Sequence, residues 1–391
     1  MNKIFVLTEN DFIFTQNQSI NILNGSIIWK TPSNIALVKY WGKQEPQIPK
    51  NTSISFTLDA CFTLTTLEYK LKKQMVAERS RSYNQNKLIS TPLNHQDYNF
   101  EIYFEGEKKD DFKPKIQKFF ERIEKYVPFL KDFEFVIKSR NSFPHSSGIA
   151  SSASGMSALA LCIMSLERSL SLVEMTDEYF NKKASFLARL GSGSACRSIE
   201  GELIVWGKHS EIKGSSNLFG IKFPYKVHKN FKNYHDTILL VDEGEKQVSS
   251  TIGHQLMENH PFAKQRFLQA NENISKISEV LQNGDLKQFM EIVEGEALSL
   301  HAMMMTSNPY FILMKPNTLK IINLIWEFRV KTNSNICFTL DAGANVHVLF
   351  PEHEKEIVNN FIISELIQFC NKNHYICDRI GIGAMQLKKD N

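Results

Sequence analysis

NSFPHSSGIASSASGMSALALCIM, residues 141–164, is the stretch that decides the fold of this 391-residue chain. It follows FEFVIKS (133–139), whose apolar and β-branched residues predict a strand. Serine and glycine then crowd together before Met156, where an almost wholly apolar helical pattern begins and runs to Leu170. A strand, a Ser/Gly-rich loop and a buried helix in this order place backbone N–H groups and the positive end of a helix at one point, which suits a phosphate group.

The residues of this loop can bind an anion in two ways. Gly148 and Gly155 let the backbone approach a ligand closely. Ser151 and Ser152 carry hydroxyls that can donate to phosphate oxygens or coordinate Mg²⁺. The loop is not a Walker A sequence, because no Gly-Lys-Ser/Thr follows. The alternative interpretation is a polar turn whose serines cap a buried helix.

The composition indicates an ordinary globular protein of up to two domains. Hydrophobic residues make up 42% of the chain and charged residues 23%. The net charge of +4 is dispersed, which argues against nucleic acid as a partner. No window reaches the roughly 18–20 apolar residues of a membrane span, and none of the six cysteines has metal-knuckle spacing. The N-terminus makes a poor signal peptide, so we expect a soluble, cytoplasmic protein.

The order of the predicted elements indicates a mixed α+β protein with two lobes. We expect the polar segment 225–236 to be the boundary, with an N-terminal lobe over 1–230 and a C-terminal lobe over 231–391. Strands are predicted at 53–59, 100–104, 133–139, 202–207, 237–242, 336–340 and 346–350, and helices at 111–127, 156–170, 176–190, 262–281, 285–304, 317–330 and 353–371.

A second candidate site is PSNIALVKYWGKQ (32–44), where two lysines flank an aromatic pair. Lys39 follows the apolar run Ile35–Val38, and Lys43 lies beyond Tyr40 and Trp41. A lysine in such surroundings needs an anion or a carboxylate partner if its charge is to be buried. The alternative is a lysine whose stem packs at the end of a strand or helix while its ammonium group reaches water.

Two further segments carry polar groups suited to an anionic substrate. GSGSACRS (191–198) alternates serine with glycine before Arg197, which can bind a carboxylate or phosphate bidentately. If a helix starts there, it forms a second anion site; otherwise it is a turn with a surface arginine. TLDAGANVHVLF (339–350) ends a strand at Asp341, a candidate general base or electrostatic stabiliser, although turn-forming aspartates are common.

These motifs together resemble the diphosphomevalonate decarboxylase family of the GHMP kinase superfamily. SNIALVKYWGK, PHSSGIASSASG, GSGSACRS, QVSSTIG (247–253) and DAGAN occur in the family's order and approximate spacing, from about residue 31 to the GIGA tail. The resemblance implies an N-terminal lobe like ribosomal protein S5 domain 2 and a C-terminal ferredoxin-like lobe, with the site between them. It implies the ATP-dependent decarboxylation of (R)-5-diphosphomevalonate to isopentenyl diphosphate, ADP, phosphate and CO₂, in the mevalonate route to isoprenoids.

The resemblance also implies roles for individual residues. Asp341 corresponds to the carboxylate that orients or deprotonates the C3 hydroxyl for attack on the γ-phosphate, and Lys39 to the lysine beside it. Arg197 corresponds to the arginine that holds the carboxylate lost as CO₂. Asn34 is a site-lining amide. The diphosphate contacts correspond to Tyr40, Lys43, Ser192 and Ser194, with Lys113 or Lys115 as candidates for a further basic residue.

The ATP site follows from the same resemblance. Gly148, Ser151 and Ser152 belong to the loop around the ATP phosphates, with Mg²⁺ bridging those phosphates and Ser152 a candidate ligand. Ser249 and Ser250 correspond to residues near the triphosphate. Neither membrane nor nucleic-acid partners are implied, and family members are commonly homodimers.

Three other functions stay open at this point. A phosphomevalonate decarboxylase would take the monophosphate, and a mevalonate 3-kinase would phosphorylate without decarboxylating; both share the superfamily fold. A non-catalytic anion- or RNA-binding protein is a more distant alternative, since S5-like lobes occur in nucleic-acid machinery. The missing basic cluster and the presence of Asp341 argue against it.

Overall fold

A computed structural model describes residues 7–14, 22–72, 98–145, 148–244 and 250–388. Its larger sheet has the strand order β14-β1-β4-β7-β5-β6, and β8 and β9 extend it from β4. All neighbours pair antiparallel except β5 and β7, which are parallel. The strands are β1 (Asn24–Val38), β4 (Ser53–Leu71), β5 (Asn99–Phe104), β6 (Glu107–Lys108), β7 (Phe133–Asn141), β8 (Leu203–Trp206), β9 (Ile221–Lys222) and β14 (Met385–Leu387).

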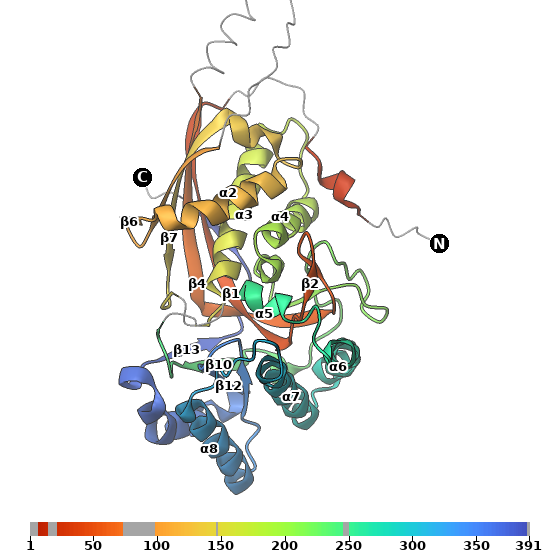
Figure 1. The fold of residues 1–391 in the computed structure, drawn as a ribbon, viewed down its shortest axis with the longest axis vertical. Coiled ribbons are helices and arrows are strands. Elements are labelled where there is room, and N and C mark those ends of the chain that lie inside the picture. Colours follow the sequence, from red (N-terminus) through yellow and green to blue (C-terminus); the bar gives the residue numbers. More distant parts are fainter. Residues whose placement is uncertain (1–6, 15–21, 73–97, 146–147, 245–249, 389–391) are drawn as a thin grey trace, which may run out of the picture.

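The pair β1–β4 forms the long spine of this sheet (Figure 1). Its register shifts between Pro32 and Asn34 and again between Ala36 and Val38. Such irregularities bend a strand and turn its side chains towards new neighbours. The β1 strand was not among the predicted elements, because its mixed polar and apolar residues follow no simple alternation. It ends one residue before Lys39.

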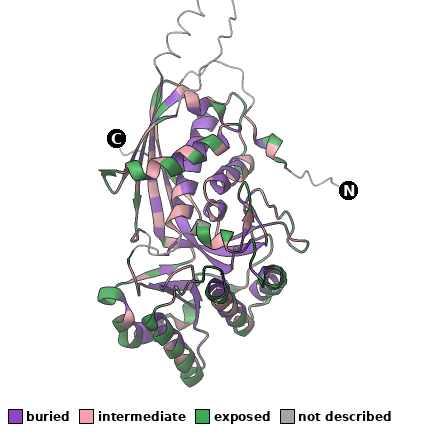
Figure 2. Ribbon diagram, in the orientation of Figure 1, coloured by how far each residue is buried: buried purple, intermediate pink, exposed green. Residues whose placement is uncertain are grey.

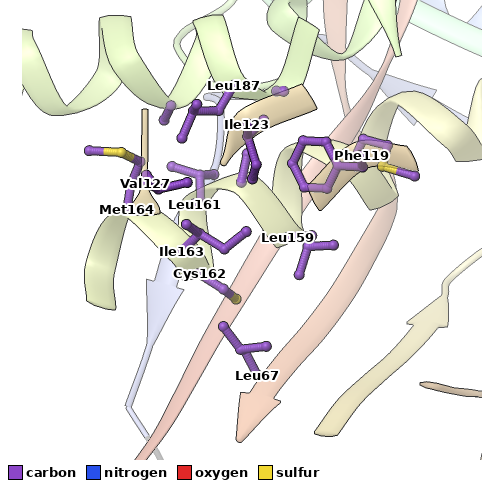
Figure 3. Packing of buried hydrophobic residues seen from close by; sticks show 14 of the residues in the cluster. Leu67, Phe119, Ile123, Val127, Leu159, Leu161, Cys162, Ile163, Met164 and Leu187 are labelled. Atoms are coloured by element: carbon purple, nitrogen blue, oxygen red, sulfur yellow. The ribbon is translucent and has the colours of Figure 1, made fainter. Parts of the chain in front are cut away.

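Three helices cover one face of the large sheet and build its core. They are α2 (Lys113–Ile123), α3 (Ser151–Leu170) and α4 (Asp177–Gly191). Figure 3 shows Leu159, Leu161 and Cys162 of α3 packed among apolar side chains from α2, α4 and β4. The α3 helix is buried along almost its whole length (Figure 2), as its continuous apolar pattern predicted.

A second sheet of four antiparallel strands has the order β11-β12-β10-β13. Its strands are β10 (His235–Leu239), β11 (Cys337–Leu340), β12 (Val346–Phe350) and β13 (Tyr375–Arg379). The helices of this part are α6 (Ala263–Asn283), α7 (Leu286–Met305), α8 (Pro316–Thr332) and α9 (Lys355–Phe361), after the short α5 (Ser250–Gln255). The α7 helix packs against both β1 and β11 and so links the two sheets.

The predicted elements are largely present, with four corrections. The α3 helix starts at Ser151, not at Met156, so the two serines lie in its first turn. GSGSACRS does not start an α-helix: α4 ends at Gly191 and a five-residue 3-10 helix, Gly193–Arg197, follows. The predicted helix 353–371 is broken into short α, π and 3-10 turns. No strand beyond 59 was predicted for β4, which continues to Leu71.

The chain passes from the large to the small sheet between β9, which ends at Lys222, and β10, which begins at His235. This connection overlaps the segment 225–236, and the two-lobe boundary there stays a prediction. It returns at the end, because β14 pairs with β1, and Gly381 donates its backbone N–H to Thr57. The N-terminal segment also contributes: Phe12 is fully buried and stacks on Phe186 of α4. In the part of the chain that the structure describes, no helix has the length and apolar character to cross a membrane.

Candidate active site

A cavity of about 490 Å³ lies between the end of β1, the start of α3, and the segment after β11. Its wall also includes side chains of β5, β7, α5 and α7. Segments far apart in the sequence therefore meet here. The predicted site residues on this wall are Asn34, Lys39, Tyr40, Gly148, Ser151, Ser152, Ser194, Arg197 and Asp341.

Lys39 places a buried ammonium group at this cavity. The residue is 2% exposed, and its Nζ donates to the backbone carbonyl of Ala36 at 2.8 Å. No ion pair joins it to a carboxylate of the described residues. Burial lowers the pKa of Lys39 to about 8, against the opposing attraction of Asp341 and Glu296. A buried cation with so little direct neutralisation suits an anionic ligand.

Arg197 is a second buried cation, 3% exposed. Its Nε donates to Asn34 Oδ1 at 3.3 Å, one Nη donates to the Ser53 hydroxyl, and the guanidinium lies over the Trp206 ring. Burial lowers its pKa below the ordinary range, yet an arginine stays charged at neutral pH. All its hydrogen-bond partners among the described residues are neutral, so an incoming carboxylate or phosphate would be its counter-ion.

Asp341 faces these two cations from the segment that follows β11. Its charge raises the pKa of both Lys39 and Arg197, which places the three groups within electrostatic reach of one another. Its backbone carbonyl accepts hydrogen bonds from His301 Nε2 at 3.1 Å and from the N–H of Gly343 at 2.8 Å. These bonds hold the main chain of the turn, while the half-buried side chain remains on the cavity wall.

The start of α3 forms another part of the wall. Ala150, just before the helix, has φ 47°, and no side chain of the described residues caps the first turn. Gly148 has φ 89°, a conformation that favours glycine. A Cβ at Gly155 would stand in open space. The uncapped N–H groups of a 20-residue helix therefore face the cavity, as an anion site requires.

Tyr40 and Ser194 complete the central wall. The Tyr40 ring packs on Trp206 and on His254, at centroid distances of 4.6 and 4.2 Å. Its buried hydroxyl has no hydrogen-bond partner among the described residues, and burial raises its pKa well above the usual range. Gly193 is required beside it, because a Cβ there would lie 2.9 Å from the Tyr40 hydroxyl. Asn34 Nδ2 donates to the Ser194 carbonyl at 3.3 Å.

Two family models match nearly the whole chain. Residues 31–96 and 83–217 match the diphosphomevalonate decarboxylase-like N-terminal domain, and residues 237–389 match the mevalonate 5-diphosphate decarboxylase C-terminal domain. The chain belongs to the diphosphomevalonate decarboxylase family.

Individual relatives agree with this assignment. The chain is 30% identical to a diphosphomevalonate decarboxylase of Ganoderma lucidum over 84% of its own length and 79% of the relative's. A solved structure of MDDEF in complex with MVAPP, AMPPCP and magnesium is 27% identical, with a TM-score of 0.74 over 93% of this chain and 99% of that one. The Staphylococcus aureus mevalonate diphosphate decarboxylase is 26% identical, with a TM-score of 0.74 over 95% and 100%. The fold is thus the two-lobed GHMP kinase fold.

Some residues that the family resemblance selected do not reach the cavity wall. Lys43 instead lies 3.1 Å from Gln47 Oε1 and 3.6 Å from a carboxylate oxygen of Glu45. Ser192 ends α4, with its N–H bonded to Ala188. Ser249 lies outside the described residues, and Ser250 begins α5, although its side chain is not described. Of the two basic candidates on α2, Lys115 lines the cavity, whereas Lys113 pairs with Asp110.

Two parts of the cavity wall were not among the residues predicted from the sequence. One is His254 of α5, which lies one residue beyond the family-like stretch QVSSTIG; burial and nearby cations lower its pKa to about 3, so the ring is neutral. The other is an apolar end formed by Ile102, Phe104, Phe112, Ile137, Met156 and Leu159. The alternation in β5 and β7 could have suggested inward-facing residues there, but not which of them face a cavity.

The described residues contain no group of three or more His, Cys, Asp or Glu side chains that could bind a metal ion by themselves. The oxygen donors near the start of α3 are the hydroxyls of Ser151 and Ser152, with the Asp341 carboxylate across the cavity. Such hard oxygen ligands suit Mg²⁺, which is commonly held by one or two protein groups together with substrate phosphates.

Proposed function

We propose that the chain catalyses the ATP-dependent decarboxylation of (R)-5-diphosphomevalonate to isopentenyl diphosphate, ADP, phosphate and CO₂. Family membership supports this reaction, and one observation supports its location in the cavity described above. Lys39 and Arg197 are buried cations without a carboxylate ion pair among the described residues, and both face Asp341 across one cavity. That arrangement suits a substrate that supplies both anionic groups and a hydroxyl.

ATP is the second substrate. The first turn of α3, with the hydroxyls of Ser151 and Ser152, accepts its phosphates, and Ser249 and Ser250 are predicted to lie close by. The apolar end of the cavity suits the adenine ring, because it offers aromatic and aliphatic contacts. The solved MDDEF structure holds AMPPCP and magnesium, which supports ATP and Mg²⁺ here. Mg²⁺ would be held by Ser152 and the ATP phosphates, where it supplies charge neutralisation between phosphate oxygens.

The first chemical step is phosphoryl transfer to the C3 hydroxyl. Asp341 orients that hydroxyl and accepts its proton as the oxygen attacks the γ-phosphorus. Lys39 faces the same cavity as Asp341 and stabilises the negative charge of the group in transfer. Because Lys39 is buried away from water, its positive charge acts on the nearby phosphoryl group with little screening.

The second step is the loss of the new C3 phosphate and of CO₂. The C3–O bond breaks with carbocation character at C3, and the electron pair of the C–C bond to the carboxylate then forms the new double bond. Arg197 holds the carboxylate and excludes water from it, fixed in position by Asn34, Ser53 and the Trp206 ring. The departing phosphate serves as the electron-accepting leaving group, so the step needs no carbonyl cofactor.

The diphosphate of the substrate is assigned to Tyr40, Lys43, Ser192 and Ser194, with Lys115 as a further cation at the cavity. Lys43 would have to leave Glu45 to reach it. A phosphomevalonate decarboxylase or a mevalonate 3-kinase would use the same Asp341 and Lys39. The similarity to diphosphomevalonate decarboxylases, and to MDDEF in complex with MVAPP, favours the diphosphate over the monophosphate as substrate. A homodimer and a cytoplasmic location complete the proposal; both rest on family resemblance and composition.

The deciding experiment compares mevalonate, 5-phosphomevalonate and 5-diphosphomevalonate, each with ATP and Mg²⁺, by the release of CO₂ and ADP. We expect CO₂ and ADP in equal amounts with the diphosphate alone. CO₂ from the monophosphate would instead identify a phosphomevalonate decarboxylase. ADP without CO₂ would identify a kinase, and no turnover with steep salt-dependent RNA binding would identify a binding protein.

A further inference from the structure

A buried carboxylate, Glu296 of α7, lies behind the candidate site without lining its cavity. The residue is fully buried. Its Oε2 accepts a hydrogen bond from the backbone N–H of Lys39 at 2.9 Å and another from Arg266, while its Oε1 accepts one from Asn273 at 2.6 Å. The carboxylate therefore has a counter-ion, Arg266, and a neutral donor, Asn273, and it also binds the main chain of the lysine.

Lys39 needs this contact because it lies just beyond the end of β1. The last β1–β4 pair joins Val38 to Ile54, so the sheet leaves the Lys39 N–H free for another acceptor. On the opposite side, Asn51 Nδ2 donates to the Lys39 carbonyl at 2.9 Å, and its Oδ1 accepts from the N–H of Trp41 at 3.0 Å. The main chain of the lysine is thus fixed from both sides.

The same helix also holds Asp341. His301 is 1% exposed, and its Nε2 lies 3.1 Å from the Asp341 carbonyl oxygen. A carbonyl only accepts, so Nε2 carries the proton. Burial lowers the pKa of His301 to about 4, and the ring is a neutral donor at pH 7. Glu296 and His301 are five residues apart, a rise of about 7.5 Å along an α-helix.

We propose that α7 sets the distance between Lys39 and Asp341, with Glu296 and His301 as positioning residues. One rigid helix binds the main chain of the lysine, at the end of the large sheet, and that of the aspartate, beside the small sheet. This inference rests on the proposed function for the roles of Lys39 and Asp341. It adds the helix that fixes the position of one lobe relative to the other at Lys39 and Asp341. Displacements of about 1 Å at reacting groups cost about 100-fold in rate.

The test compares Glu296→Gln with Glu294→Gln. Glu294 is a matched control, because it is also a buried glutamate on α7 but pairs with Arg329 and Trp326, away from the cavity. For Glu296→Gln we expect kcat to fall about 10- to 100-fold with KM for ATP nearly unchanged. For Glu294→Gln we expect lower thermal stability with kcat within about twofold of the wild type. Equal kcat losses in the two variants would overturn the inference.

The pH dependence gives a readout that a merely structural role would not move. The charged and titratable groups that act on Lys39 are Asp341, Glu296, Arg197, Asp236 and His301. Glu296 raises the pKa of Lys39, so its neutralisation lowers that pKa further. The alkaline limb of kcat/KM should move to lower pH in Glu296→Gln and stay in place in Glu294→Gln. An unmoved limb in both would contradict the inference.

Two further measurements keep the inference testable if Glu296→Gln does not fold or the reaction proves different. Glu296→Asp keeps the charge but withdraws it from the Lys39 N–H, so kcat should fall without a shift of the alkaline limb; wild-type kcat would overturn the inference. The Lys39 titration can also be followed without turnover, by NMR of ¹³C-labelled lysine assigned with Lys39→Arg. A wild type that releases no CO₂ refutes the proposed function. The NMR titration still tests the contact between Glu296 and Lys39: the pKa of Lys39 should be lower in Glu296→Gln than in the wild type, and an unchanged pKa would overturn the inference.

Discussion

Two polar regions of the cavity wall, the start of α3 and the charged group around Lys39, are built in different ways. At the start of α3 the ligand-facing groups are backbone N–H groups and small hydroxyls, supplied by residues close together in sequence. Around Lys39, Arg197 and Asp341 the groups are charged side chains from three distant segments. The first end offers dipoles, which bind phosphates with little desolvation. The second offers buried charges, which cost more to assemble and act more strongly on a transition state.

The largest effect should come from the charged end. Asp341→Asn keeps the size of the side chain but removes the proton acceptor, so we expect kcat to fall at least about 1,000-fold. ATP binding, assigned to the α3 end, should stay within about twofold. Measurement of CO₂ release together with ATP-analogue affinity by calorimetry checks both. If Asp341→Asn kept near-wild-type turnover, the division of labour between the two ends would be wrong.

Arg197→Lys should weaken the charged end less severely. Lysine keeps the charge but loses the bidentate geometry and the contacts to Asn34 and Ser53. A hydrogen bond to a charged group contributes roughly 1.5–3 kcal/mol, so we expect kcat/KM for diphosphomevalonate to fall about 10- to 150-fold. KM for ATP should change little, and steady-state kinetics with each substrate varied separates the two. A rise confined to KM for ATP would show that Arg197 binds ATP and not the carboxylate of diphosphomevalonate.

The lowered pKa of Lys39 predicts that rising pH decreases activity but increases the contribution of this residue to stability. Its pKa is lowered from 10.5 to about 8 by burial, so the cation is lost above about pH 8 and kcat/KM should fall there. Between pH 8 and 10.5 the unfolded chain binds more protons at this lysine than the folded one, so its contribution to stability rises with pH. Lys39→Arg should remove the alkaline limb. Thermal unfolding measured alongside activity distinguishes this titration from denaturation; a limb retained in Lys39→Arg would assign it to another group.

The same contrast explains what the sequence could predict. The α3 end follows from a local pattern of glycine, serine and a continuous apolar helix, and only the start of the helix was misplaced, because serines in its first turn have the composition of a loop. The charged end depends on the bends in β1 and on the packing of α7 against two sheets. The motifs singled out Lys39, Arg197 and Asp341 separately, but their spacing along the chain says nothing about their distance in space.

His254, Glu296 and the apolar end of the cavity show the limit more clearly. His254 lies on a six-residue helix with no pattern of its own, and Glu296 resembles any other acid in a helix until its burial is known. The apolar end takes residues from β5, β7, α2 and α3 that would be equally suited to a core.

The smallest effect should come from the α3 end. Ser152→Ala removes one hydroxyl but leaves the backbone N–H groups of the helix start in place. A neutral hydrogen bond contributes roughly 0.5–1.5 kcal/mol, so KM for ATP should rise only about two- to tenfold, with a similar change at saturating Mg²⁺. Gly155→Val tests the contribution of the backbone N–H groups. Its side chain would enter the open space next to the first turn of α3, where the phosphates are proposed to bind. If Ser152→Ala raised KM for ATP as much as Arg197→Lys lowers kcat/KM, ATP binding would depend on this hydroxyl more than on the backbone N–H groups of the helix start, which would contradict the contrast between the two parts of the wall.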